Sequence, residues 1–236
     1  GKIDDLMRVE EYIFRKSESA KRIRTLGWQP EGFFAYGDGI YTDRFIRVNE
    51  IGMVNLKDYG IFYLPAFSVM YRDNRLKFAF EKSFTYTHRA DVSMADYLKL
   101  FVEVFGDNGK VAIAFILATL FRDFIFEMFE FFPILNIFGK PQSGKSQLGK
   151  AMKGFFTNSY KPINYEGETY PAINKALEQT ANCLVHFDEY KNSIEWRKVE
   201  LLKSMWDGVG RGKMKDGDVE RVNVNCGVIL SGQEMP

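Results

Sequence analysis

A chain of 236 residues with 46% hydrophobic and 16% aromatic side chains can bury a substantial core, which excludes an intrinsically disordered protein. The length fits one large domain or two modest ones. Its formal net charge is +1, so the molecule as a whole has no strong field that would attract nucleic acid or an acidic membrane surface. Any such contact must therefore come from a local cluster of charges.

The cysteines indicate the redox state of the cellular compartment, and the apolar runs indicate whether the chain can cross a membrane. Cys183 and Cys226 both lie in apolar runs, where a buried thiol is expected rather than a disulfide or a metal ligand. A reducing, cytoplasmic setting is expected for this reason. The apolar stretch 111–138 is interrupted by charged side chains, and its uncharged parts are too short to span a membrane. No membrane partner is expected.

The first half of the chain changes from a helical to a β-rich pattern. Residues 3–26 predict a charged helix with an apolar stripe, ending at Gly27. Over residues 28–87, short aromatic and β-branched runs alternate with glycine, asparagine and aspartate, which is typical of a small β-rich region. Ser93 and Asp96 predict a capping box that opens a helix to about residue 105, and a long apolar helix is expected over 110–130.

Beyond residue 131, strand-like and helix-like runs alternate. The expected strands are ILNIF, CLVHF and GVILS, and the expected helices are QLGKAMKGFF, TYPAINKALEQ and IEWRKVELLKSMW. This alternation predicts an α/β fold with a mainly parallel sheet and helices on its faces. We therefore expect an α+β region over residues 1–90, connecting helices over 91–131, and an α/β part over 132–236.

A glycine-rich segment between the first of these strands and its helix matches the pattern GxxxxGK[ST] of a phosphate-binding P-loop. Its residues are Gly139, Lys140, Pro141, Gln142, Ser143, Gly144, Lys145 and Ser146, and Gln147 follows. In such a loop the backbone N–H groups face phosphate oxygens, Lys145 reaches the β- and γ-phosphates, and Ser146 offers its hydroxyl to Mg²⁺. The flanking strand and helix favour this reading over a surface turn that matches by chance, so ATP and Mg²⁺ are expected at residues 139–147.

A second candidate element is the run CLVHFDE, an apolar strand that ends in two carboxylates, Asp188 and Glu189. This is the Walker B form, in which the aspartate holds magnesium and the glutamate orients or deprotonates the attacking water. By itself, an acidic pair after a strand is commonly a solvated turn. The glutamate beside the aspartate favours water as the acceptor, hence hydrolysis. His186 is expected to be a core histidine without a catalytic role.

The last apolar run, GVILSGQ, is expected to lie beside the strand that precedes the P-loop. Its polar end places Gln233, with Ser231 as the second choice, to contact the γ-phosphate or the lytic water. The alternative is a strand-end amide with no such role. One of these two side chains is therefore the predicted sensor of bound nucleotide.

Residues 208–225 precede this last run and predict a hairpin. The hairpin carries Arg211, Lys213 and Lys215 among several glycines. Flexible backbone with cations suits contacts to DNA phosphates, whereas the alternative is a solvated loop.

Taken in this order, the P-loop, the Asp-Glu strand, the hairpin and the polar strand end resemble those of AAA+ ATPases. Within them, the resemblance is to the hairpin-bearing branch of minichromosome-maintenance and viral superfamily-three helicases. The strings YGIFYLPAFS, FGKPQSGKSQLG, HFDEYKN, WDGVGRG and GVILSGQEMP are similar to replication proteins of bacterial mobile elements and phages, often described as primases or primase-helicases. The resemblance implies a hexameric ring that moves along single-stranded DNA. It also implies an arginine finger and a second sensor after the last strand, so the chain looks like part of a longer protein.

The predicted function is the magnesium-dependent ATPase motor of a DNA replication helicase or primase-helicase. One alternative is an AAA+ loader or switch that remodels a partner protein without tracking DNA, and another is a non-enzymatic assembly module. A GTPase is disfavoured, because the string nearest to the guanine-reading NKxD motif, residues 174–177, lacks its aspartate.

Overall fold

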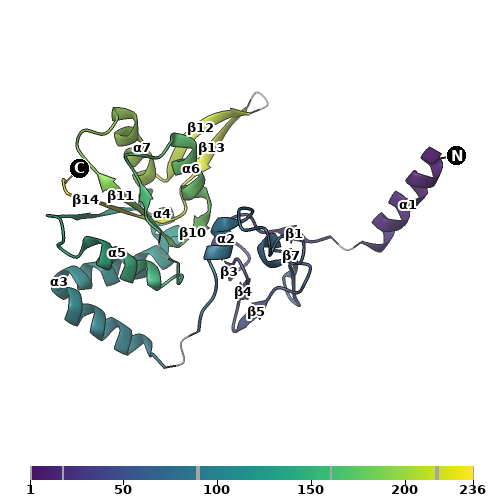
Figure 1. The fold of residues 1–236 in the computed structure, drawn as a ribbon, viewed down its shortest axis with the longest axis horizontal. Helices are drawn as coiled ribbons and strands as arrows, with labels where there is room; N and C mark the ends of the chain where they lie inside the picture. Colours follow the sequence, from purple (N-terminus) through teal and green to yellow (C-terminus); the bar gives the residue numbers. More distant parts are fainter. Residues whose placement is uncertain (1, 18, 89–90, 160, 216–217, 236) are drawn as a thin grey trace.

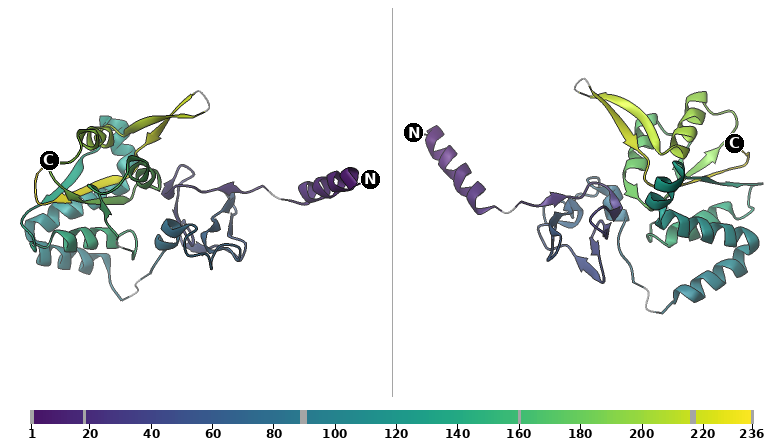
Figure 2. Two further views of the ribbon diagram at one scale, coloured as in Figure 1. Left: turned by 45° about the horizontal axis from the view of Figure 1, so that its top comes forward. Right: turned by 180° about the vertical axis from the view of Figure 1, so that it is seen from behind.

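The computed structural model describes residues 2–17, 19–88, 91–159, 161–215 and 218–235. They form a projecting N-terminal helix, a small β-rich part and an α/β part (Figure 1). Helix α1 (Lys2–Lys16) lies away from the rest of the chain in all views (Figures 1 and 2). None of the described helices is long and apolar enough to cross a membrane.

The N-terminal helix is shorter than the sequence predicts. It ends at Lys16 instead of Gly27, and the chain continues as β1 (Lys21–Arg22) and β2 (Leu26–Gln29). Leu26 is buried and pairs with Thr180, far along the chain. Strand pairing and burial therefore override the local helical propensity of this segment.

The β-rich part confirms the pattern of residues 28–87. One sheet has the order β1-β7-β6 and the other the order β10-β2-β3-β4-β5. The remaining elements are β3 (Phe33–Tyr36), β4 (Gly39–Tyr41), β5 (Phe45–Arg47), β6 (Met53–Leu56), β7 (Gly60–Tyr63), the 3-10 helix η1 (Pro65–Phe67) and helix α2 (Ala79–Ser83). Strand β10 (Thr180–Ala181) belongs to the C-terminal half, so this sheet joins the two parts.

Helix α3 (Met94–Leu120) begins at the predicted cap, where the Ser93 hydroxyl accepts a hydrogen bond from the Asp96 N–H. Gly106 interrupts it with a left-handed φ of 59°, which separates the two helices that the sequence predicts. Helix α4 (Arg122–Phe129) follows after a break at Phe121. The expected apolar helix over 110–130 is therefore two helices.

A four-stranded parallel sheet forms the centre of the α/β part, as predicted. Its order is β8-β14-β11-β9, with β8 (Ile134–Phe138), β14 (Gly227–Gly232), β11 (Leu184–Tyr190) and β9 (Ile163–Asn164). Side chains alternate between the two faces of β14. Ile229 packs with α3 and α5 (Lys145–Gly154), whereas Val228 and Leu230 pack with α6 (Tyr170–Glu178) and α7 (Trp196–Trp206).

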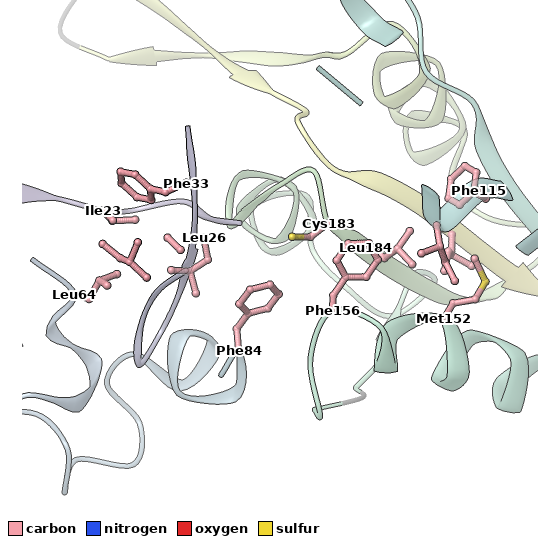
Figure 3. Packing of buried hydrophobic residues seen from close by; sticks show 14 of the residues in the cluster. Ile23, Leu26, Phe33, Leu64, Phe84, Phe115, Met152, Phe156, Cys183 and Leu184 are labelled. Atoms are coloured by element: carbon pink, nitrogen blue, oxygen red, sulfur yellow. The ribbon is translucent and has the colours of Figure 1, made fainter. Parts of the chain in front are cut away.

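The hydrophobic core runs without interruption from the β-rich part into the α/β part. Figure 3 shows Leu26 and Phe84 on one side, Cys183 and Leu184 between, and Met152 beyond them. Both cysteines are buried and free, as the sequence predicts.

The predicted hairpin is also present. Strands β12 (Val209–Lys215) and β13 (Asp218–Asn223) pair antiparallel, from Val209 opposite Asn223 to Lys215 opposite Asp218. The hairpin projects from the α/β part, near α6 and α7 (Figures 1 and 2).

Candidate functional site

The parallel strands bring the candidate residues to one edge of the sheet. Strands β8, β14 and β11 all run in the same direction, so their carboxyl ends meet at this edge. In the register, Gly232 lies opposite Phe138 on one side and Tyr190 on the other. The glycine-rich loop after Phe138, the acidic pair before Tyr190 and the polar end of β14 are therefore neighbours. Strand β14 lies directly beside β8, as predicted.

The glycine-rich loop wraps around the ammonium group of Lys145, the first residue of α5. The Lys145 Nζ donates to the carbonyl oxygens of Gly139, at 2.6 Å, and Lys140, at 2.7 Å. Gly144 has a left-handed φ of 87°, which turns the chain into the helix at a conformation that glycine adopts without strain. The first N–H groups of α5 have no partner within the helix, so this end attracts anions.

The other members of the predicted loop are largely solvent-facing. Lys140, Pro141, Gln142 and Ser143 are exposed in the loop, and Ser146 and Gln147 are exposed on the first turn of α5. An incoming ligand can therefore reach the loop without displacing buried side chains.

A cavity of about 480 Å³ lies against this loop. Gly139, Ser143, Gly144 and Lys145 form its polar side. Its other walls come from β8 and from the middle of α3 and are mostly apolar, with two asparagines, Asn108 and Asn136, among them. The apolar lining residues of these elements include Val104, Phe105, Val111, Ala112, Leu135 and Ile137. The size is that of a small-molecule site. The α3 wall was not predicted, and the sequence signal near it is Gly106, which interrupts this helix.

The acidic pair sits at an irregularity of β11. The pairing of β11 with β14 shifts between Phe187 and Tyr190, and Glu189 adopts a left-handed φ of 63°. Such a backbone costs roughly 1–3 kcal/mol for a residue other than glycine, and strain of this kind concentrates at functional sites. The bulge leaves Asp188 half-buried, with its Oδ1 accepting the Glu189 N–H at 2.9 Å, and turns Glu189 out to solvent.

A buried chain of hydrogen bonds links the acidic pair to β14. The Ser231 hydroxyl donates to Asp188 Oδ1 at 2.6 Å, and its oxygen lies 2.6 Å from His186 Nε2. The hydroxyl has a single proton, so His186 donates to Ser231 from Nε2. Burial lowers the pKa of His186 from 6.5 to about 4, which keeps the ring neutral. His186 is therefore a buried histidine that positions Ser231.

The two sensor candidates differ in their surroundings. Ser231 is only 1% exposed and contacts Asp188 directly. Gln233 lies just beyond the end of β14 and is exposed. The structure thus brings the second-choice residue into the hydrogen-bond chain and leaves the first choice at the open edge.

Ser231→Ala is expected to lower the free energy of unfolding by about 1–3 kcal/mol, because the buried His186 Nε2–H loses its acceptor and Asp188 Oδ1 keeps only its bond from the Glu189 N–H. Chemical denaturation measures the difference. The matched control is Ser204→Ala on α7, which removes a longer bond of 3.3 Å to a helix carbonyl and is expected to change stability by no more than about 0.5 kcal/mol. Equal losses in the two variants would contradict a special role for the Ser231 chain.

The predicted DNA-contacting cations lie on the hairpin. The structure describes the backbone of Arg211, Lys213 and Lys215 within β12, where Lys213 is opposite Glu220 and Lys215 is opposite Asp218. Their side chains lie outside what the structure describes. Their role therefore stays a prediction.

Comparison with known proteins finds no protein-family model that matches the chain and no curated protein that is similar to it. The fold is an α/β arrangement with a parallel sheet and a small β-rich part.

Proposed function

We propose that the chain is the ATP-hydrolysing core of an AAA+ P-loop ATPase and works as the motor of a DNA replication helicase or primase-helicase. The observation that carries the ATPase assignment is the strand order. Strand β14 lies between β8, which leads into the glycine-rich loop, and β11, which ends in Asp188 and Glu189. Phosphate-binding, metal-binding and water-activating groups therefore meet at one edge of the sheet.

Each group has a distinct task in this proposal. The N–H groups of residues 139–147 and the Lys145 ammonium hold the phosphates of ATP. Ser146 and Asp188 hold Mg²⁺, which neutralises charge on the phosphates when bound. Glu189, exposed at the bulge, orients the attacking water and accepts its proton. Ser231 keeps Asp188 oriented through its hydrogen bond. Gln233, exposed just beyond β14, is the proposed sensor of the γ-phosphate.

The cavity beside the loop supports a nucleotide as the ligand. Its polar side suits phosphates, and the mostly apolar walls from α3 and β8 suit the planar base. Residues 174–177 lack the aspartate that would read guanine, so ATP is favoured over GTP.

The motor assignment depends on the hairpin and on the resemblance to helicases. Arg211, Lys213 and Lys215 belong to β12, and the hairpin that β12 forms with β13 projects from the α/β part (Figure 1). By resemblance, several copies of the protein form a hexameric ring that places these hairpins around single-stranded DNA. Measuring the ATPase rate of the full-length protein with and without single-stranded DNA tests the motor. An ATPase that DNA does not stimulate would point to a loader or switch.

Replacing Lys213 and Lys215 with Ala in the full-length protein is expected to weaken single-stranded DNA binding. The magnitude of the log–log salt slope of affinity should fall by roughly 1 to 1.4, because each lost contact to a single-strand phosphate is worth about 0.7. Basal ATPase should survive, whereas stimulation by DNA should be lost. Affinity titrations over a range of salt concentrations measure the slope.

The matched control replaces Lys57 and Lys99, two exposed lysines far from the hairpin, with Ala. It should leave the DNA affinity and the salt slope as they are in the parent. If the hairpin variant also keeps both, the hairpin does not contact DNA and its cations are simply solvated.

A further inference from the structure

A second cavity, of about 530 Å³, lies between the β-rich part and the α/β part and shares no residue with the cavity at the glycine-rich loop. One wall is the strand segment 21–30, and the opposite wall includes the start of α4 and the residues around Asn182. Four of its lining side chains are cationic and one is acidic. They are Lys21, Arg22, Arg24 and Arg122 against Asp123.

Arg122 is the unusual member of this lining. It is only 2% exposed, and its Nε and Nη2 have no hydrogen-bond partner among the described residues. The guanidinium carbon lies 5.1 Å from the centre of the Phe126 ring and 5.4 Å from that of Phe132. The two aromatic rings stabilise the positive charge. They do not supply the oxygen acceptors that the N–H groups in the plane of the guanidinium require.

The neighbouring acid does not satisfy this arginine. Asp123 accepts a hydrogen bond from Asn182 Nδ2 at 2.8 Å. An arginine stays charged in a protein, and buried N–H groups without an acceptor are costly. The lining of the cavity therefore includes a buried cation whose Nε and Nη2 have no acceptor among the described residues, and the cavity is large enough to admit an anion.

The rim adds groups that suit a nucleotide unit. Arg22 and Arg24 are exposed, while Lys21 is already paired with Glu31. Trp28, on β2, lines the same cavity and is 37% exposed, so its ring is accessible to a planar base. Aromatic rings beside cations form stacking platforms for single-stranded nucleic acid.

This cavity continues toward the hairpin. A neighbouring hollow of about 650 Å³ shares Arg22, Arg24, Thr25 and Asn225 with it. The same hollow reaches Asn223, the last residue of β13. Its lining also includes Lys175 and two acids, Glu81 and Glu178, so cationic, polar and acidic groups line the way from the base of the hairpin to Arg122.

We propose that this second cavity binds a phosphate group of single-stranded DNA, with Arg122 as the buried donor, Arg24 at the rim and Trp28 stacked on a base. The choice of DNA as the source of the phosphate rests on the proposed function. Recognition of an anion rests on the cavity alone.

Arg122→Met tests the buried donor, because methionine keeps an apolar contact with Phe126 and Phe132 but has no N–H groups. The affinity of the full chain for a labelled oligothymidylate, measured by fluorescence anisotropy without ATP, is expected to fall about 10-fold or more. The midpoint of thermal unfolding is expected to stay the same or rise, since the unpaired buried donors are gone. A lower midpoint with unchanged DNA affinity would overturn the proposal and make Arg122 a structural residue.

Two exposed positions test the same cavity with little risk to folding. Trp28→Ala is expected to weaken oligothymidylate binding by between about 5- and 150-fold, the range for loss of one stacked base. The matched control Trp196→Ala removes a tryptophan that is 64% exposed on α7, outside the cavity, and should not change the affinity. Arg24→Gln should weaken binding, and Arg75→Gln, an exposed arginine elsewhere, should not. Unchanged affinity in both cavity variants would also overturn the proposal.

Thymidine monophosphate and inorganic phosphate serve as competitors that separate the two sources of phosphate. Weak competition by both supports a DNA strand as the ligand of the cavity. If the monophosphate displaces the labelled oligomer at concentrations as low as those at which the oligomer itself binds, the cavity is a site for a free nucleotide. That result would overturn the DNA assignment.

The ATPase rate without DNA tests the proposed function separately. An inactive parent chain that still binds oligothymidylate through Trp28 would refute the ATPase and leave the cavity assignment standing.

Discussion

Lys145→Ala is expected to abolish productive ATP binding. The Lys145 ammonium is held at the centre of the glycine-rich loop by the carbonyl oxygens of Gly139 and Lys140. In the proposed complex, this cation turns to the β- and γ-phosphates and is their principal positive partner. Alanine leaves the N–H groups of the loop but removes that charge. Equilibrium titration with Mg-ATP, followed by a turnover assay, measures the loss.

A matched control separates the role of this lysine from a general effect of charge. Lys150→Ala removes an exposed lysine from the same helix, α5, and should bind and hydrolyse ATP like the parent. Thermal unfolding of Lys145→Ala shows whether the loop and helix remain folded. If the folded Lys145→Ala variant still binds and turns over ATP normally, the site is wrongly assigned.

Glu189→Gln is expected to keep the affinity for ATP and to slow hydrolysis by at least ~100-fold, because the amide has the same shape but cannot accept a proton. The structure indicates that this substitution does not disturb buried contacts. Glu189 is exposed at the bulge, and its side chain forms no part of the buried Ser231–Asp188 contact. An equilibrium titration gives the affinity for ATP, and a single-turnover experiment gives the rate of hydrolysis independently of it.

Glu127→Gln on α4 is the matched control, since it changes an exposed glutamate on another element. It should hydrolyse ATP at the parent rate. Loss of ATP binding in Glu189→Gln would instead show that Glu189 is a magnesium ligand or that its charge maintains the bulge.

Much of the candidate site could be predicted from the sequence, because its parts are local. A strand, a loop with glycines and a helix follow one another over residues 134–154, and each is specified by neighbouring residues. The same holds for the apolar strand that ends in Asp188 and Glu189 and for the antiparallel hairpin of β12 and β13. The α/β class with a parallel sheet follows from this alternation.

Tertiary structure decided the features that depend on residues far apart in the chain. Residues 21–29 look helical locally but form β1 and β2, since Leu26 pairs with Thr180. The contact of Ser231 with Asp188 needs β14 and β11 to be adjacent, with a bulge in β11 that no local pattern predicts. Periodicity tells which side chains share a face, but it does not tell which distant element covers that face.

The two cavities also depend on residues that lie far apart in the chain. The α3 wall beside the glycine-rich loop arises where α3 and β8 border the same space, and the space around Arg122 arises where β1 and β2 approach α4. In the sequence, Arg122 is only a charge that interrupts an apolar run, which argues against a membrane span. Its surroundings, in which Nε and Nη2 are buried without an acceptor among the described residues, are formed by Phe126, Phe132 and a segment about a hundred residues away in the chain. Only the folded chain brings these together.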